Sequence, residues 1–341
     1  MGIFSRKNHF EVDGRTVLIT GGSQGMGRGL GKLLAQKGAN VVIVARTQGK
    51  LDEALKYISS FAKSPQTQRF HAISADLISP EENARVLDEV TTWNDGHPPD
   101  IVWANAGMAH PSLFIETPLE TLRSQMDMNY WAAAYLAHAT LKLWLRPVTP
   151  KATPTDPESP KPRHFIMTSS VACFVGIAGY CPYSPAKAAL RNLADTLRSE
   201  VNLYNGFRRS KNPPSSSGVP AADVHIHCVA PGTITSPGYA NEQLTKHPVT
   251  MVLEEGDAVQ TEDEVALAAV TGLERGGFLI TTQWLGHAMR AGALGGSARN
   301  GWGVMDTVFS WVVNIAWLFI GPDMESKVWN WGKTNEVKLP A

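Results

Sequence analysis

Cysteine is scarce in this chain, which has three among 341 residues, at Cys173, Cys181 and Cys228. They form no C-x-x-C pair and no even set. This excludes a disulfide-stapled secreted scaffold and favours a reducing compartment. A thiolate metal centre is not indicated either, and we expect no bound metal.

An excess of charge is also missing, because 31 basic residues balance 31 acidic ones. No global field draws such a chain toward nucleic acid, so we expect no nucleic-acid partner. Residues 1–9 are polar and have no apolar core, and a cleaved signal peptide is not expected. The 43% of hydrophobic residues suffice for one large core. A single α/β domain with appendages is favoured over two domains.

A glycine-rich turn lies near the start of the chain. An apolar run at 16–20 leads into this turn, and a helical pattern follows as far as Gly38. A strand, a glycine turn and a helix in this order form a phosphate site, because backbone N–H groups and the positive helix end face an anion. The glycine spacing differs from the ordinary dinucleotide fingerprint, and a plain turn is the alternative. We expect cofactor contacts from Gly21, Ser23, Gln24, Gly25, Met26 and Gly27.

Strand-like and helix-like segments alternate along the chain. The apolar runs predict strands at 16–20, 40–44, 69–74, 101–105, 164–168, 224–230 and 278–281. Helical patterns are predicted at 48–62, 80–92, 119–145, 183–205 and 262–273. Such alternation predicts a doubly wound parallel sheet, with the first and fourth strands side by side and the ligand at the carboxyl ends of the strands.

The end of the second strand indicates which cofactor binds. Arg46 stands where an NAD site commonly has an acidic residue for the ribose hydroxyl. A guanidinium pairs well with a 2′-phosphate, so Arg46 predicts NADPH, with a solvated surface arginine as the alternative. Lys50 is a second candidate for the same phosphate.

Two further strand ends supply candidate cofactor contacts. Asp76, followed by Leu77, ends the third strand, where its carboxylate is suited to accept from the adenine amino group or to cap the next helix. The fourth strand ends in Asn105, Ala106 and Gly107, whose small size permits close approach of the cofactor.

The candidate catalytic residues follow the fifth strand. Tyr183 and Lys187 are four residues apart at the start of a helix and share one face. An ammonium beside a phenol favours the phenolate, so we expect Lys187 to lower the pKa of Tyr183. Ser170 precedes the tyrosine by 13 residues, enough for a loop to return its hydroxyl beside the phenol.

These motifs occur in the order and approximate spacing of the short-chain dehydrogenase/reductase family. The chain resembles that family over residues 12–285, through the glycine turn, the Asn105 turn, Asn129, the set of Ser170, Tyr183 and Lys187, and Pro231-Gly232. The resemblance implies one Rossmann-type domain with about seven parallel strands, after a tail at 1–11. Ala104 departs from the family pattern, in which many members have a second asparagine.

The resemblance also implies roles for the matching residues. Tyr183 would protonate a carbonyl oxygen, Ser170 would hydrogen-bond that oxygen, and Lys187 would hold the nicotinamide ribose. Asn129 would position a water that relays protons to Lys187. The loop after the sixth strand would contact the nicotinamide through Pro231, Gly232, Thr233 and Ile234. Relatives commonly form dimers or tetramers through their long helices, so a homo-oligomer is expected.

Two insertions interrupt the domain. Residues 146–163 contain six prolines and little to bury, and residues 206–220 are similar in character. Because strands resume directly after the first, both are predicted to be surface loops or flexible segments rather than domain boundaries.

The C-terminal region, 286–341, departs from a soluble reductase. Residues 308–320 are nearly all apolar. As a helix they would extend about 20 Å, short of the roughly 30 Å hydrocarbon core. Extension back to Trp302 includes Asp306. We favour an interfacial or re-entrant membrane anchor, with a packing or dimerisation helix as the alternative. The anchor would place five tryptophans at headgroup level: Trp302, Trp311, Trp317, Trp329 and Trp331.

Within the family, the likeness is to NADPH-dependent reductases that act on a long-chain 2-amino ketone at the cytosolic face of the endoplasmic reticulum. It is carried by the glycine turn, Arg46, the loop at 231–238 and the apolar C-terminal segment. It implies a lipid ketone substrate and a membrane partner. Two alternatives remain: a membrane-bound reductase of 3-ketoacyl-CoA or steroid ketones, and an NADPH-binding membrane protein without turnover.

Overall fold

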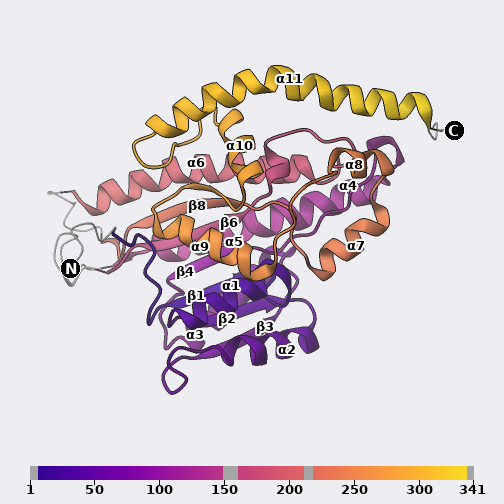
Figure 1. The fold of residues 1–341 in the computed structure, drawn as a ribbon. Helices are drawn as coiled ribbons and strands as arrows, with labels where there is room; N and C mark the ends of the chain where they lie inside the picture. Colours follow the sequence, from indigo (N-terminus) through magenta and orange to yellow (C-terminus); the bar gives the residue numbers. More distant parts are fainter. Residues whose placement is uncertain (1–6, 149–159, 211–217, 336–341) are drawn as a thin grey trace.

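A computed structural model of the protein describes residues 7–148, 160–210 and 218–335. Its centre is a seven-stranded parallel sheet in the order β3-β2-β1-β4-β6-β8-β9 (Figure 1). Strands β1 and β4 pair in parallel, as the crossover rule predicts. The expected doubly wound sheet is confirmed. Its strands are β1 (Thr16–Thr20), β2 (Asn40–Ala45), β3 (Phe70–Ser74), β4 (Ile101–Ala104), β6 (Arg163–Thr168), β8 (Val224–Ala230) and β9 (Leu279–Thr281).

Helices cover both faces of the sheet. One face carries α1 (Gly25–Gln36), α2 (Gln48–Ser59) and α9 (Glu262–Glu274), and the other carries α3 (Pro80–Trp93), α5 (Ala132–Trp144) and α6 (Ser184–Arg208). Successive strand side chains point to opposite faces, so Val17 and Ile19 join one core cluster while Leu18 joins the other. Burial on both faces is why these strands are continuous apolar runs.

The helix expected at 119–145 is irregular at its middle. It consists of α4 (Leu119–Met126), a π-helical turn η2 (Asp127–Trp131) and then α5. A π turn inserts an extra residue into the helical repeat and often marks a functional position. Here it contains Asn129, whose side chain is buried.

The two predicted insertions meet in space. Strand β5 (Pro147–Val148) from the first pairs antiparallel with β7 (Val219–Pro220) from the second. Helix α6 continues to Arg208, past its expected end at Asn205, because the Asn205 side chain bonds the backbone of Val224 and Arg208 pairs with Asp223. Neither the two-stranded β5–β7 ribbon nor the helical conformation of residues 206–208 was predicted. The remainder of the insertions, 149–159 and 211–217, lies outside the described residues, as do residues 1–6 of the tail.

The strands are followed at their carboxyl ends by short helices that rim the cavity described below. Two of them, α7 (Pro237–Thr245) and α8 (Pro248–Leu253), follow β8, and α10 (Trp284–Gly292) follows β9. Two short 3-10 turns, η1 (Phe114–Glu116) and η3 (Val171–Cys173), lie after β4 and β6. These strand-to-helix connections carry the candidate site.

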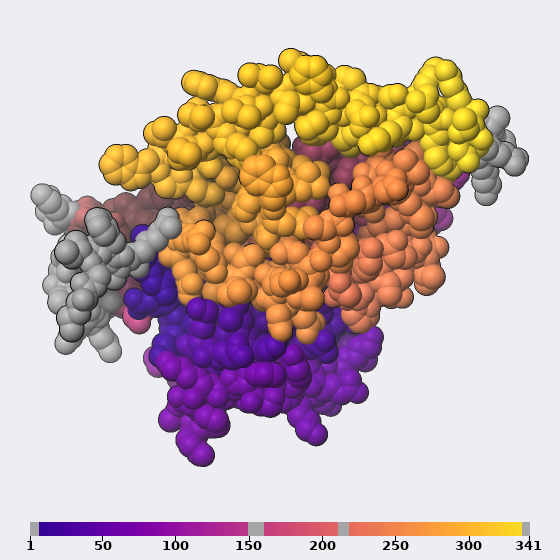
Figure 2. All heavy atoms as spheres, in the orientation of Figure 1, coloured from indigo at the N-terminus to yellow at the C-terminus, as the bar shows by residue number. Residues whose placement is uncertain are grey.

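The last helix, α11 (Val304–Thr334), has 31 residues and Pro322 within it. At 1.5 Å per residue it is about 46 Å long, so the helix extends well beyond the apolar run at 308–320, which alone would span about 20 Å. By length and composition this helix is able to cross a membrane. Of its most apolar stretch of 18 residues, 6% is buried within the protein. It contacts α10 and α8, and Figure 1 and Figure 2 show it running along one side of the molecule.

Candidate active site

A cavity of about 410 Å³ opens at the carboxyl ends of the strands. It is formed by the loops after β1, β2, β3, β4, β6, β8 and β9, as expected for a doubly wound sheet. Two of the residues predicted to form the site, Gly27 and Asn129, do not line it. The others do: Gly21, Ser23, Gln24, Gly25, Met26, Arg46, Lys50, Asp76, Leu77, Asn105, Ala106, Gly107, Ser170, Tyr183, Lys187, Pro231, Gly232, Thr233 and Ile234.

The glycine turn has the shape of a phosphate cradle. Gly21 has φ +65°, and a Cβ there would lie 2.9 Å from the Cα of Ala106, so only glycine fits. Gly27 lies behind the turn, where a Cβ would come 2.1 Å from the Gly21 carbonyl oxygen. Because Gly27 has no side chain, α1 can pack closely against the turn.

The N-terminus of α1 is open to an anion. Its N-cap residue, Gln24, makes no side-chain capping bond, and the first turn contains no acidic residue. The first backbone N–H groups of a helix have no partners within the helix, and they carry the positive end of its dipole. With the glycine cradle, this end fits the pyrophosphate of a dinucleotide.

Thr20 fastens the turn after β4 to the end of β1. Its Oγ1 accepts from the backbone N–H groups of Asn105 and Ala106, at 2.9 and 3.0 Å. The Asn105 side chain accepts from Thr168 Oγ1 at 3.1 Å. These bonds hold three strand ends together and keep the Asn105 turn close to the glycine cradle.

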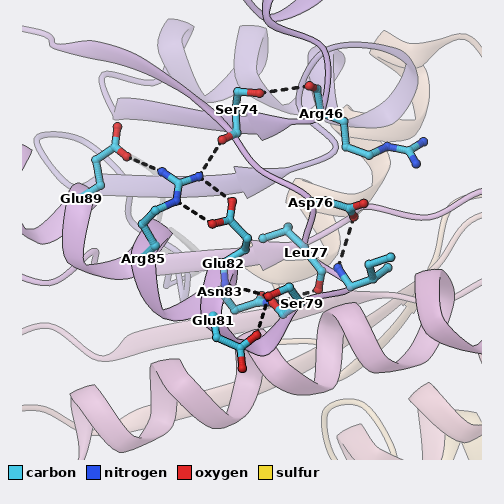
Figure 3. Close-up of polar contacts among 11 residues, drawn as sticks. Arg46, Ser74, Asp76, Leu77, Ser79, Glu81, Glu82, Asn83, Arg85 and Glu89 are labelled. Carbon is cyan, nitrogen blue, oxygen red and sulfur yellow. Dashed lines mark hydrogen bonds and ion pairs between the residues drawn. The ribbon is translucent and has the colours of Figure 1, made fainter.

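Arg46 and Asp76 lie at the end of the cavity beside the glycine turn (Figure 3). Within the described part of the chain, no acidic group pairs with the Arg46 guanidinium, whereas nearby Arg85 is engaged by Glu82 and Glu89. An unpaired guanidinium on a cavity wall is suited to bind a phosphate. The residues at this end therefore fit a dinucleotide that carries a 2′-phosphate.

The alternative role of Asp76 as a helix cap is wrong. Helix α3 is capped by Ser79, whose hydroxyl accepts from the Glu82 N–H at 3.2 Å. Asp76 stays at the cavity, where its carboxylate accepts a long, 3.4 Å bond from the Ile78 N–H. Its position leaves it available to a ligand.

The three candidate catalytic residues meet in the middle of the cavity. Ser170 is the N-cap of the η3 turn, where its hydroxyl accepts from the Ala172 N–H at 3.2 Å and lies close enough to the Tyr183 phenol to affect its pKa. Lys187 is 3% exposed, and its ammonium lies 5.6 Å from the centroid of the Tyr183 ring. Lys187 donates to the Thr168 carbonyl at 3.0 Å. A phenol, a hydroxyl and an ammonium thus converge from β6 and α6.

The acid–base character of this group differs from the expectation. Burial raises the pKa of the Tyr183 phenol, the neighbouring Ser170 hydroxyl opposes the rise, and the Glu242 carboxylate adds to it. Burial also lowers the pKa of Lys187 to about 8. The expected net lowering of the tyrosine pKa is not found, because burial outweighs the effect of an ammonium that lies 5.6 Å from the ring centroid and donates to a backbone carbonyl. The neutral phenol, which can donate a proton, is the stable form at neutral pH.

Asn129 lies behind the cavity wall. Its Oδ1 accepts from the Met108 N–H at 3.1 Å, and its Nδ2 donates to the Met108 and Gln125 carbonyls at 3.0 Å. A Cβ on Gly107 would lie 2.7 Å from Asn129 Oδ1 and 3.1 Å from Lys187 Nζ. The glycine therefore leaves an opening between the asparagine and the lysine.

Several residues of the cavity were not predicted. Gln283 follows β9, lines the cavity, and its buried Oε1 has no hydrogen-bond partner among the described residues. The strand-end rule, applied to the seventh strand, identifies this position. The helical segments after β8 and the loop before α6 add four more residues, for which the sequence has no local signal: Tyr180, Glu242, Glu254 and Asp257.

A group of histidines lies on β6 and β8, away from the cavity. The ring nitrogens of His164, His225 and His227 come within 4.8 Å of one another. Both ring nitrogens of His227 form hydrogen bonds: Nε2 with His164 Nδ1 at 3.0 Å, and Nδ1 with the Gly277 carbonyl at 2.8 Å. Burial lowers the pKa of His164 and of His227, the latter to about 4, so these two rings are neutral and hydrogen-bonded within the core, while His225 is exposed.

Comparison with known proteins agrees with this geometry. A family profile described as short chain dehydrogenase matches residues 15–246. The chain is 52% identical over 332 residues to the 3-ketodihydrosphingosine reductase of Aspergillus fumigatus, an alignment that covers 97% of this chain and 88% of the relative. It is 43% identical over 334 residues to the 3-ketodihydrosphingosine reductase of Neurospora crassa, covering 98% and 86%.

A solved structure supports the fold. A short chain dehydrogenase/reductase from Burkholderia phymatum in complex with NAD has a TM-score of 0.62 at 16% identity, over 80% of this chain and 90% of that one. At this identity the likeness shows the fold alone. The profile match over more than half of the chain, with the two fungal relatives, shows that the chain belongs to the short-chain dehydrogenase family of oxidoreductases.

Proposed function

We propose that the protein reduces 3-ketodihydrosphingosine to dihydrosphingosine with NADPH, a step of sphingolipid biosynthesis. The observation that carries the proposal is 52% identity, over nearly the whole chain, to a relative named for this reaction. The meeting of Ser170, Tyr183 and Lys187 on one cavity supports reduction of a ketone rather than binding alone.

The chemistry follows from the protonation states of these residues. Reduction needs a hydride at the ketone carbon, which a bound reduced nicotinamide supplies, and a proton at the ketone oxygen. Tyr183 carries that proton, because burial keeps its phenol neutral. The Ser170 hydroxyl donates a hydrogen bond to the same oxygen and stabilises the charge that develops on it.

Lys187 acts after proton transfer. Its ammonium, 5.6 Å from the Tyr183 ring, stabilises the phenolate that remains. The phenolate then takes up a proton that Lys187 gives up, and Asn129, beside the opening left by Gly107, is suited to orient a water that returns a proton to Lys187. The tyrosine is then ready for another turnover.

The preference for NADPH over NADH is proposed from Arg46. Its guanidinium faces the cavity at the end of β2, the position at which an NAD site commonly has an acidic residue for the ribose 2′-hydroxyl. The remaining dinucleotide contacts are proposed from the glycine turn, Lys50, Asp76, Leu77, the Asn105 turn and residues 231–234.

Membrane association is proposed from α11. Its exposed side chains include Trp311, Ile315, Leu318 and Phe319, each at least 64% exposed. Such a helix along one side of the molecule suits the surface of a bilayer, and a long-chain substrate would reach the cavity from there. The proposed site of action is the cytosolic face of the endoplasmic reticulum.

A homo-oligomer, dimer or tetramer, is proposed through the long helices. The outer surface of α6 exposes Leu203 to 72%, and Trp131 beside α5 is 42% exposed and stacks on Tyr135. Light scattering on the detergent-solubilised protein measures the mass directly, and a monomer would contradict this.

Oxidation of NADPH by the purified protein in detergent tests the function. The substrates compared are 3-ketodihydrosphingosine, a 3-ketoacyl-CoA and a ketosteroid. Preferential turnover of the sphingoid ketone is expected. Turnover of another ketone alone reassigns the substrate but keeps the catalytic residues. NADPH binding with no turnover of any of them contradicts the enzyme proposal.

A further inference from the structure

One end of the cavity is rich in carboxylates. Beyond Tyr183, the ring of Tyr180 lies with its centroid 6.1 Å away, and the Tyr180 hydroxyl donates to Glu242 Oε1 at 2.5 Å. Glu254 and Asp257 line the same cavity. Burial and the nearby Glu242 raise the pKa of Tyr180, so its phenol remains neutral and keeps donating to the carboxylate.

A buried lysine fixes two of these carboxylates. The Lys246 side chain is 1% exposed, and its Nζ lies 3.0 Å from Glu242 Oε1 and 2.6 Å from Glu254 Oε2. The same ammonium lies 5.6 Å from the ring centroids of Tyr180 and Tyr239. Because two carboxylates and two rings surround it, Lys246 holds this end of the cavity in one arrangement.

The charges at this end do not balance. Three carboxylates face the single ammonium of Lys246, and within the described residues no cation pairs with Asp257. Burial, with the neighbouring Glu254, raises the pKa of Asp257, and the Lys246 ammonium offsets the rise only in part. A cationic ligand would relieve this imbalance.

We propose that Glu242, with Glu254 and Asp257 beside it, binds the ammonium group of a 2-amino ketone while Tyr183 protonates the neighbouring carbonyl oxygen. This inference rests on the proposed function and names the part of the protein that selects its substrate class. In a 2-amino ketone, the nitrogen is two bonds from the carbonyl carbon. A ketone oxygen at Tyr183 therefore puts the ammonium within reach of the carboxylates next to Tyr180.

The same charges discriminate against the other ketones. A polyanionic acyl-CoA would bring negative charge toward three carboxylates. A steroid ketone is neutral and would leave the carboxylates uncompensated. The amino ketone alone supplies the missing charge.

The test compares two substrates on one variant. 3-Ketodihydrosphingosine carries the amine, and 1-hydroxyoctadecan-3-one has the same chain and ketone without it. Glu242→Gln keeps the shape and can still accept from Tyr180. We expect kcat/KM for the amino ketone to fall about 10- to 100-fold, the range for loss of one charge-assisted hydrogen bond, while kcat/KM for the amine-free ketone changes less than about threefold. Asp257→Asn should give the same selective loss.

The matched control is Glu255→Gln, because Glu255 is exposed and does not line the cavity. It should leave both substrates unchanged. Equal losses for the two ketones in Glu242→Gln, or no loss in any cavity variant, would overturn the ammonium site while leaving the reductase intact. If wild-type protein turns over neither ketone, the proposed function itself fails, so the two failures are distinguishable.

Discussion

Arg290 and Asp306 form a two-bond ion pair that joins α10 to the first turn of α11. The Arg290 nitrogens lie 2.9 and 2.7 Å from the two Asp306 oxygens, and the two side chains are 8% and 13% exposed. At the other end of α11, the ring centroid of Trp331 lies 4.9 Å from that of His247, the N-cap residue of α8. The helix is thus attached to the catalytic body near both ends. Asp306, the acidic residue just before the apolar run at 308–320, is one of the attachments.

This double attachment predicts that α11 lies in the plane of the membrane surface and does not cross the bilayer. Two variants test this, each with one new cysteine just outside an end of the helix: Trp302→Cys and Asn335→Cys. Both also carry Cys181→Ser, which removes the exposed native cysteine. In sealed microsomes both should react with an impermeant maleimide before detergent is added. Protection of either position until detergent is present would show a spanning helix instead.

The apolar surface of α11 should provide the binding to lipid. Trp311→Glu with Leu318→Glu places two charges among residues that are 66% and 70% exposed, so the fold should be kept while membrane affinity falls. Flotation with anionic vesicles measures the bound fraction, which we expect to fall by more than half. Leu267→Glu, at an exposed position on α9, is the control and should float like the unaltered protein.

Loss of the Tyr183 hydroxyl should abolish turnover and spare cofactor binding. The phenol supplies the proton for the ketone oxygen, and general acids contribute about 10²- to 10⁴-fold to rate. Tyr183→Phe should therefore lose at least about 100-fold in kcat. NADPH affinity, followed by the change in its fluorescence, should stay within a few-fold. A variant with full reductase activity would disprove the assigned proton donor.

Arg46→Asp should weaken NADPH far more than NADH. Loss of a charge-assisted bond to a 2′-phosphate costs about 1.5–3 kcal/mol, roughly 10- to 100-fold in affinity, and the new carboxylate adds repulsion. NADH lacks that phosphate and should bind equally well or better. Arg85→Gln is the matched control, because Arg85 is bound to Glu82 and Glu89 and does not line the cavity. Equal losses for both cofactors in Arg46→Asp would refute the phosphate contact.

The sheet was predictable because each of its strands is marked by a pattern of neighbouring residues in the sequence. Strands buried on both faces are continuous apolar runs, and the expected bounds of β1 and β8 match the structure. The glycine turn, Arg46 and the Tyr183 helix were also found from local patterns, and the structure brings them to one cavity.

What the sequence did not reveal depends on long-range contacts. The β5–β7 ribbon joins residues about 70 positions apart, and Tyr180 meets Glu242 only in the folded chain. The length of α11 was underestimated for another reason. Gly321 and Pro322 end the apolar run after Ile320, and polar residues follow, but the helix continues through them and has an i,i+4 pair of Asp323 and Lys327 at 2.9 Å.

The lowered pKa of Lys187 predicts an alkaline limit to activity. Lys187 must be an ammonium to stabilise the Tyr183 phenolate, and its pKa is about 8 rather than the ordinary 10.5. The charged form is therefore fully present below pH 7 and is lost as pH rises through 8. We expect kcat/KM for NADPH, which reports groups of the free enzyme, to fall about tenfold per pH unit above that point. Lys187→Arg keeps its charge at these pH values, so its residual activity should lack this fall. A wild-type profile that stays flat to pH 10 would contradict a required ammonium, because a neutral amine cannot stabilise the phenolate.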